Sequence, residues 1–501
     1  MKPEDLAKWL NLSVIFSLTL MGMCMVPFFA PVAKERFFLR PSFIGYVFAG
    51  FPVGYVLSSI LITFCNIAHF STPTINVVIR ISVTIDIVVS LLFGAIPFMM
   101  TFEDNLASEL TTMFVLMFLR VMMGCATAVL DTAVLLFLVR LFPDKMSEMV
   151  GLNEALAGLG LLFGPPIGGA LYDVGGYFLP FAVCCGISFV FVVVSGILIL
   201  KSESIQDLFA ERHANYKKEA GHRTVTPKHL KVLAKAPLHL VVGPSLLSAF
   251  GFSAYTMLES MAPLHYKQQW ELSPGVIGAA IGGASVVYAV LAIVIGKLIG
   301  KPSIKRRRPL LLACGPLCIG LATFLAAPSL PTVLGHEISI ATGRGVGLLG
   351  MISLGAALPL MTVVGQSIVV DAAKGKGDKL VPAAGAIGNL MTSAGAFTGP
   401  VVGSHLVQAY GFSDAFFYYT CASVVVAFLY LMCFIADSAR GLDVQHISDL
   451  PQFAEVVETL PGDEEEGNSS WHKGGDDPSE STAFLSADNE KGYHPRVQTV
   501  Q

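Results

Sequence analysis

The chain has 501 residues, of which 54% are hydrophobic and only 14% are charged, and its formal net charge is −4. Segments 177–200 and 415–435 contain no charged residue, and each is longer than the roughly 20 apolar residues that cross a bilayer. The composition excludes a water-soluble globular protein and predicts one that crosses a membrane many times.

Twelve hydrophobic segments follow one another along the chain, six on each side of a polar insert. Helices are expected for all of them, because a helix satisfies its own backbone polar groups inside lipid. Their centres lie near Leu20, Gly54, Val88, Met123, Leu161, Phe191, Phe250, Val286, Gly320, Leu349, Ser393 and Val425. The predicted fold class is an all-α integral membrane protein with 12 transmembrane helices in two six-helix halves.

Polar segments divide the chain into four parts. Residues 1–200 are expected to form an N-terminal six-helix bundle and residues 237–437 a C-terminal one. Residues 201–236 mix acids and bases, which predicts a cytoplasmic linker. Residues 438–501 are rich in Asp, Glu, Ser and Gly, so we expect a disordered acidic cytoplasmic tail.

Basic residues predict the orientation of the protein. The loops on the side of both termini hold most of the lysines and arginines, including the run Lys305–Arg308, and such loops face the cytosol. Both termini are therefore expected to be cytosolic. A basic run between two spans determines topology, so we expect no nucleic-acid partner.

The tail contains a segment that approximates an acidic dileucine sorting signal. Glu480 precedes Phe484 and Leu485 by four and five residues. This spacing predicts a sorting adaptor as a partner and a vesicle, endosomal or lysosomal membrane as the location. The alternatives are a chance match in an acidic tail and a location in the plasma membrane.

One signature, G-x-x-x-G-P-x-x-G, occurs once in each half. Glycines four residues apart let another backbone approach one helix face, and the proline bends the helix. The signature predicts two homologous halves, with packing hinges on these two helices at the seam where the halves move. Its residues are Gly160, Gly164, Pro165 and Gly168 in the first copy and Gly395, Gly399, Pro400 and Gly403 in the second.

Charged residues inside the spans are the candidates for chemistry, because each costs about 2.5 to 3.5 kcal/mol at mid-bilayer. Arg120 and Asp131 share one stripe of the fourth helix, but about 16 Å along its axis separates them. Asp131 and Glu154 are candidates for proton coupling. Arg120 has two open interpretations, proton coupling or a structural tie to backbone carbonyls. Arg80 and Asp86 are expected to pair with other helices.

Glu259 lies four residues after Tyr255 and seven after Phe252 on the seventh helix. This spacing places a carboxylate and two aromatic rings on one helical face, as in a cage for a cation. The alternative is that the carboxylate is wetted near the end of the helix and the rings only pack.

The nine cysteines lie within or at the edge of hydrophobic spans and do not match a zinc spacing. We therefore expect neither disulfides nor a metal site, and no cofactor. No span combines a nucleophile with a base, so the sequence does not predict an enzyme.

Several motifs resemble those of a known transporter family. The fourth helix carries L-x-x-x-R-x-x-x-G at Leu116–Gly124, and the fifth carries G-P-P-x-G-G from Gly164. With the two halves of six spans, they resemble the major facilitator superfamily in its proton antiporter branch, over residues 9–437. More narrowly, segments 151–154 and 158–172 resemble the vesicular amine transporter family, closest to its vesicular polyamine transporter branch.

This resemblance implies roles for particular residues. Glu259 matches a helix 7 carboxylate implicated in cation binding, Tyr288 a helix 8 tyrosine, and Asp371 the acid that ends helix 10. Asn389 stands where vesicular monoamine transporters have an acid, and residues 9–32 lack their helix 1 Asp. The departures favour a polyamine over a monoamine. The expected substrate-binding residues are Glu259, Tyr255, Tyr288 and Asn389, and the expected proton-coupling residues are Asp131, Glu154, Asp371 and Arg120.

The cytoplasmic gating motif of the superfamily is absent from residues 65–76, which contain no acid. Its second copy is half present at Gly296–Lys301, where Gly300 occupies the position of the acid. The sequence leaves open how the cytoplasmic side closes.

The leading hypothesis is a secondary active proton antiporter that moves an organic cation, a polyamine or another amine, into an acidic vesicle. One alternative is a major facilitator carrier for a neutral or anionic solute or drug, with Arg120 and Arg344 as anion ligands. Another is a non-transporting membrane receptor or scaffold. The expected partners are an organic cation, protons and the lipid bilayer, and the chain is expected to be a monomer.

Overall fold

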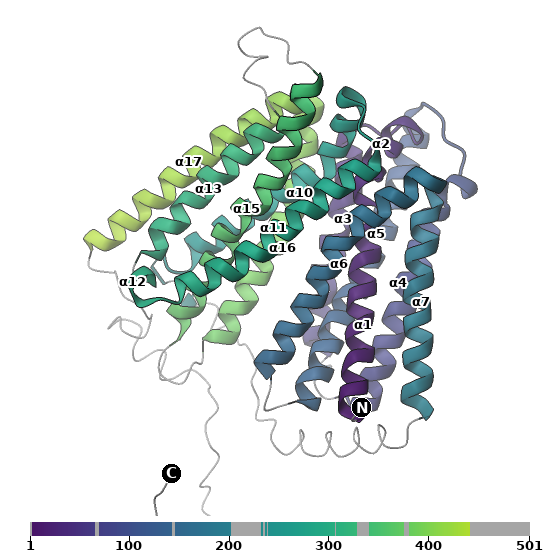
Figure 1. Ribbon diagram of the computed structural model, residues 1–501, viewed down its shortest axis with the longest axis horizontal. Coiled ribbons are helices and arrows are strands. Elements are labelled where there is room, and N and C mark those ends of the chain that lie inside the picture. The colour runs from purple at the N-terminus through teal and green to yellow at the C-terminus, as the bar shows by residue number, and fades with distance from the viewer. Residues whose placement is uncertain are drawn as a thin grey trace, which may run out of the picture. The chain divides into compact units, whose positions relative to one another are not determined.

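The computed structural model describes residues 3–65, 70–142, 146–201, 232–233, 236–237, 239–305, 307–327, 340–374 and 380–440. Regular structure in these ranges is helical, and Figure 1 shows the helices coloured along the chain. The first half contains α1 (Pro3–Met23), α2 (Val26–Glu35), α3 (Pro41–Cys65), α4 (Thr72–Met99), α5 (Leu106–Leu141), α6 (Met146–Gly175) and α7 (Phe178–Lys201). The second contains α10 (Val242–Trp270), α11 (Pro274–Ile299), α12 (Pro302–Lys305), α13 (Arg308–Ala326), α15 (Ile340–Ala373), α16 (Val381–Tyr410) and α17 (Phe412–Ala439).

Each of the twelve predicted span centres lies in a different long helix. Ten helical segments of the described chain are long and apolar enough to cross a membrane. The other two long helices, α10 and α16, carry polar residues such as Glu259 and Asn389, pack on each other, and contact α2 and α3 of the first half. Glu259 is buried in α10, whereas the neutral side chain of Asn389 is exposed on α16. The predicted fold class is confirmed.

The first membrane segment, Asp5–Glu35, is broken into α1 and α2 by a turn at Cys24 and Met25. Pro27, the second residue of α2, causes the break. It has no N–H to donate to the carbonyl of Met23, and its ring would collide with that carbonyl in a continuous helix.

The internal repeat is visible in the packing. Helix α1 packs on α6 as α10 packs on α16, α3 packs on α5 as α11 packs on α15, and α4 packs on α7 as α13 packs on α17. The halves meet through α6 against α11, α3 against α16 and α2 against α10. We call the end at which α1, α6, α10 and α16 begin the near end, and the opposite end the far end.

The repeated glycines pack inside their own halves. A Cβ atom at Gly164 would collide with Met23 of α1, and one at Gly168 would collide with the Cys24 carbonyl that follows it. In the second half, a Cβ at Gly395 or Gly399 would collide with the backbone of α10. The seam between the halves was expected at these helices, and α6 and α16 do lie there. Their prolines form the contact.

The prolines face the other half. The Pro165 carbonyl lies against Gly278 of α11, Pro166 lies against Gly282, and the Pro400 carbonyl lies against Gly45 of α3. Helices α6 and α16 therefore each pack their glycines against their own half and their prolines against the other half.

Three sequence predictions fall largely or wholly outside the described residues. They are the linker 201–236, the tail 438–501 and the sorting-like segment 480–485. The division of the chain at these boundaries stays a prediction.

Candidate functional site

Arg120 lies inside α5, where α3 and α5 are in close contact. A Cβ at Gly124 would collide with the Phe51 carbonyl, and one at Gly54 would collide with the Val121 carbonyl. Small residues on both helices thus bring the Phe51 ring to 5.0 Å from the Arg120 guanidinium carbon. The arginine is 7% exposed, so its charge is held away from solvent over an aromatic face.

The Arg120 guanidinium has few direct partners. Its Nη1 lies 3.8 Å from the Met123 Sδ atom, and its Nε has no hydrogen-bond partner in the described part of the chain. The carboxylates whose charges act most strongly on it are Glu259 of the second half and Asp86 of α4. Arg120 therefore interacts electrostatically with an acid of its own half and with an acid of the other half.

Glu259 is buried in α10 and 9% exposed. Its Oε1 atom has no hydrogen-bond partner among the described residues. One turn earlier on the same helix, Tyr255 lies close enough to Ser285 of α11 for their side chains to interact. Tyr288, on the next turn of α11, lies close enough to Tyr255 to interact with it electrostatically. The sequence-predicted residues Glu259, Tyr255 and Tyr288 are thus brought together.

A small cavity adjoins Glu259. Its volume is about 10 Å³, and its lining includes residues of α10, α11 and α15, namely Tyr255, Leu258, Glu259, Ile281, Ala284, Met351 and Leu354. This volume is at the lower limit for one water molecule. The cavity has no room for an organic substrate in this conformation.

A second acidic pair lies in the first half. The Tyr55 hydroxyl of α3 donates a hydrogen bond of 3.2 Å to Asp131 Oδ2. Glu154 of α6 is exposed, and its charge acts on Asp131. The charges of Asp131 and Glu154, two of the predicted proton-coupling residues, are thus close enough to interact, and Asp131 lies about 16 Å from Arg120 along α5.

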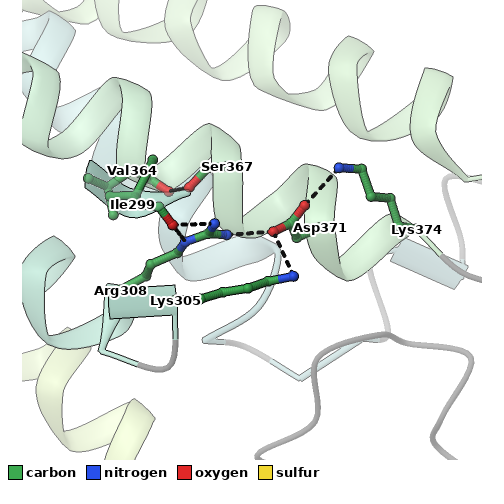
Figure 2. Close-up of polar contacts among 7 residues, drawn as sticks. All are labelled: Ile299, Lys305, Arg308, Val364, Ser367, Asp371 and Lys374. Carbon is green, nitrogen blue, oxygen red and sulfur yellow. Dashed lines mark hydrogen bonds and ion pairs between the residues drawn. The ribbon is translucent and has the colours of Figure 1, made fainter. Parts of the chain in front are cut away.

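Asp371 and Asn389 lie away from this centre. Asn389 is exposed on α16. Asp371 is in the last turn of α15, 17 residues after Leu354, and this spacing corresponds to about 25 Å along the helix. Figure 2 shows that Asp371 lies in a cluster of cations instead.

In that cluster, Arg308 Nη1 donates to Asp371 Oδ2 at 2.5 Å, while its Nε and Nη2 donate to the Ile299 carbonyl at 3.0 and 2.6 Å. Lys305 lies 3.4 Å from Asp371 Oδ2, and Lys374 lies 2.9 Å from Oδ1. One arginine therefore ties the end of α11 to the end of α15. The Ile299 carbonyl lies inside Gly296–Lys301, the half-present copy of the gating motif, in which Gly300 occupies the position of the acid.

The first half uses another arrangement at the same end. Arg140, in the last turn of α5, donates a hydrogen bond of 2.6 Å to the Phe70 carbonyl. This carbonyl precedes α4, so an arginine again ties the loop between the second and third spans to the fourth span.

Arg80 and Asp86 do contact other helices. Arg80 donates to Ser195 of α7, to Asn11 of α1 at 3.4 Å and to Asn76 of its own helix at 3.2 Å. These partners are neutral. Asp86 is 3% exposed and interacts with the charge of Arg120.

Polar contacts between the halves lie at the far end. Lys267 of α10 pairs with Glu35 of α2 at 3.1 Å, and the Gly275 N–H of α11 donates to Asp173 Oδ2 of α6 at 2.9 Å. The far end is therefore closed by bonds from both halves.

Two further bonds join α3 to α16 at this end. The Tyr46 hydroxyl and His405 Nε2 are 2.8 Å apart, and the Ser42 N–H donates to Gln408 Oε1 at 3.1 Å. The sequence patterns did not identify His405, Asp173 or Gln408 as contacts between the halves. For Asp173 and Gln408 a signal was available. Their spacing from the proline of each repeat was the available signal, because both follow it by eight residues.

Together, the fold and the site define a multi-pass membrane carrier with two homologous halves around a charged centre. The family model described as Major Facilitator Superfamily matches residues 12–377, and the chain belongs to this superfamily. It is therefore a transporter and not an enzyme.

Curated relatives carry the name MFS-type transporter SLC18B1. The Homo sapiens protein is 31% identical over 182 residues, which cover 36% of this chain and 35% of the relative. The Mus musculus protein is 26% identical over 282 residues, which cover 56% of each chain. The chain thus matches about one third to just over half of the length of these relatives.

Solved structures share the fold. The nucleoside transporter NupG has a TM-score of 0.62 at 13% identity, covering 87% of this chain and 99% of that one. A bacterial homologue of the human lysosomal transporter Spinster, described as inward-facing and unoccupied, has a TM-score of 0.60 at 13% identity, covering 87% and 97%.

Proposed function

We propose that the chain is a proton antiporter that moves an organic cation, a polyamine or another amine, into an acidic vesicle. The observation that carries the proposal is the buried carboxylate of Glu259, whose Oε1 has no hydrogen-bond partner among the described residues and which interacts with the charge of Arg120. A buried carboxylate with an unsatisfied oxygen is costly in a membrane protein unless a cation or a proton joins it.

The balance of charge at the centre supports exchange. Arg120 interacts with both Glu259 and Asp86, but one guanidinium neutralises only one carboxylate. The other acid requires a proton or a substrate ammonium group. Because the two compete for the same carboxylate, binding of one favours release of the other, and this competition is the basis of antiport.

The surroundings of Glu259 suit an amine with a hydrocarbon chain. The Tyr255 ring lies one turn away and offers an aromatic face to an ammonium group. The apolar side chains Ile281, Met351 and Leu354 line the same cavity. Opening of this cavity provides a carboxylate for the charged group and an apolar wall for methylene groups.

The pair Asp131 and Glu154 distinguishes polyamines from monoamines. It offers a second acidic position about 16 Å from the level of Arg120 along α5. A compact monoamine reaches one acidic position, whereas a long polyamine reaches both. We assign proton coupling to the same pair. Asp131 accepts a hydrogen bond from the Tyr55 hydroxyl, and a hydroxyl does not cancel the charge of the carboxylate, whereas a proton does.

Alternating access follows from the contacts between the halves. The polar bonds that join α2, α3 and α6 to the second half lie at the far end, so rocking residues 1–200 against residues 237–437 opens and closes opposite ends. We assign the near end, with its basic loops, to the cytosol. The conformation described here is then closed toward the vesicle lumen.

Uptake into proteoliposomes tests the proposal. With an acidic interior, wild type should accumulate spermidine or spermine in preference to serotonin or dopamine. Glu259→Gln should weaken cation binding by about tenfold or more, because hydrogen bonds to charged groups contribute about 1.5 to 3 kcal/mol. The control is Glu271→Gln at the far end, where the side chain is 79% exposed. Unchanged polyamine affinity in Glu259→Gln would contradict the assignment.

A carrier for organic anions is the second candidate, because Arg120 Nε is buried without a hydrogen-bond partner in the described chain. Arg344, the other arginine considered as an anion ligand, donates instead to the Trp270 carbonyl at 2.7 Å. Competition by organic anions, lost in Arg120→Gln and retained in Glu259→Gln, would favour this candidate over the amine carrier.

A further inference from the structure

Cations cover the near end of the second half, outside the proposed substrate site. Lys301, Lys305 and Arg307 lie in the connection from α11 to α13, and Lys374 follows the last turn of α15. We call these four residues the basic rim. Lys301, Arg307 and Lys374 are exposed, and the side chain of Lys305 is 34% exposed.

The acid at this position does not balance the rim. Asp371 contacts Lys305, Lys374 and Arg308, so among these described groups three cations share one carboxylate and two positive charges remain. Arg308 is buried and directs its other nitrogens to the Ile299 carbonyl. Figure 2 shows the two lysines reaching Asp371 from opposite sides. Counter-charge is therefore needed at the exposed lysines rather than at the arginine.

The rim lies where apolar helix surface gives way to polar chain. On α11, Val294 and Leu298 are 51% and 38% exposed, and on α13, Leu310 is 47% exposed. Exposed apolar side chains of a membrane helix contact lipid tails, so the lysines that follow them lie at the level of the lipid headgroups.

We propose that the basic rim binds the phosphate groups of anionic phospholipids in the leaflet at the near end. The headgroups supply the negative charge that Asp371 does not, and they hold the connection from α11 to α13 against α15. Charge complementarity and depth favour this occupant. The inference does not depend on which substrate is carried, since it concerns a surface remote from Glu259.

Lipid retention by the full-length protein tests the proposal. The protein is reconstituted in phosphatidylcholine with and without phosphatidylserine, and the lipids that remain bound after gentle extraction are identified by native mass spectrometry. Wild type should retain phosphatidylserine selectively and unfold at a higher temperature in its presence. The test variant combines Lys301→Gln, Lys305→Gln and Lys374→Gln. Each of these three changes should weaken the retention of phosphatidylserine by about fivefold.

Three controls separate charge from folding. Replacing the same three lysines by arginine should preserve retention. The double variant Lys34→Gln/Arg36→Gln removes two exposed cations at the far end. It should keep the rise in unfolding temperature that phosphatidylserine causes in wild type. If the triple glutamine variant does not fold, Lys301→Gln alone tests the proposal, because Lys301 is exposed and the ion pairs of Asp371 described above are made by Lys305, Arg308 and Lys374.

Equal retention of phosphatidylserine by wild type and the glutamine variants would overturn the proposal. Stabilisation by inorganic phosphate equal to that by phosphatidylserine would also overturn it, because the site would then not require a lipid. If neutralising Glu464, Glu465 and Glu466 reproduced the loss seen in the rim variant while phosphatidylserine had no effect, the acidic tail would be the occupant and the proposal would be wrong.

Discussion

Two buried acids and one buried base interact at the centre of the molecule. Glu259 and Asp86 are both buried, and both interact with the charge of Arg120. The excess acid is what a carrier for cations or protons requires, because an empty site must be neutralised before it crosses the apolar middle of the membrane. In the proposed function, the burial of these acids therefore favours the exchange of a proton for an amine.

Coupling is predicted to depend on Asp131 or Glu154. Asp131→Asn or Glu154→Gln mimics the protonated acid, so the variant that replaces the proton carrier should lose pH-driven accumulation while retaining substrate exchange at equal pH. Both activities are measured by radiolabelled uptake in proteoliposomes. Glu103→Gln, at an exposed position, is the control.

The same variants also test a purely structural role for this pair. Poor expression together with loss of substrate binding would indicate that the acid supports the fold. Full retention of pH-driven accumulation would remove that residue from the mechanism.

Among the helices, α6 shows how one element serves two contacts. Its glycines accept α1, with Gly164 against Met23, and its prolines meet α11, with Pro165 against Gly278. The first contact belongs to the stability of one half. In the proposed alternating access, the second contact forms and breaks as the far end closes and opens.

Glycine substitutions should separate these two contacts. Gly164→Leu should lower the thermal stability of the protein by about 1 to 3 kcal/mol, because it overpacks the first half. Gly278→Ala should leave the fold stable but prevent closure at the far end, since its Cβ would collide with the Pro165 carbonyl. Cross-linking between halves and thermal unfolding provide the two measurements.

Gly158→Ala is the matched control, because no atom outside its own helix lies within 4 Å of the added Cβ. Wild-type transport and stability are expected for it. If Gly278→Ala also behaved like wild type, α6 and α11 would not be in close contact during the cycle.

The ion pair at the end of α15 is predicted to be structural. Asp371→Asn should destabilise the second half by about 2 kcal/mol, because it leaves the buried Arg308 without its acid. Lys374→Gln should cost less than about 1 kcal/mol, since the lysine side chain is 50% exposed. Equal thermal shifts for the two variants would contradict this division.

In the whole molecule, polar bonds between the halves collect at the far end. They include Glu35 with Lys267 and Tyr46 with His405. Among the residues that the structure describes, the polar bonds between the halves close one end, an arrangement that fits the proposed alternating access. The far-end bonds must break for the carrier to reverse.

A reducible cross-link across α3 and α16 should trap this conformation. Ser42→Cys with Gln408→Cys, in a chain with its other reactive cysteines replaced, should be joined by a short bifunctional reagent that forms a disulfide with each thiol, because the Gln408 side chain spans the gap to the Ser42 N–H at 3.1 Å and the shorter cysteine leaves room for the reagent. Transport should stop and return on reduction. Either single variant serves as the control, and transport by the cross-linked protein would show that these positions need not separate.

Much of the fold was predictable because lipid imposes a local rule. Each span must satisfy its own backbone, so hydrophobic segments counted six on each side of the polar insert located all twelve long helices, including the more polar α10 and α16. The repeated signature predicted two homologous halves, and the packing of α1 on α6 and of α10 on α16 confirms them. The break at Pro27 also follows from local chemistry, although the span containing it reads as continuous.

The partners of the buried charges were decided by the tertiary structure. Asp86 lies six residues from Arg80 in sequence, yet it faces Arg120, while Arg80 turns to neutral groups on α1 and α7. These pairings depend on how each helix is rotated and tilted against neighbours far away in the chain. The sequence by itself determined which segments enter the membrane and that they repeat, because both depend on local composition. Which charge meets which was decided only by the packing of helices.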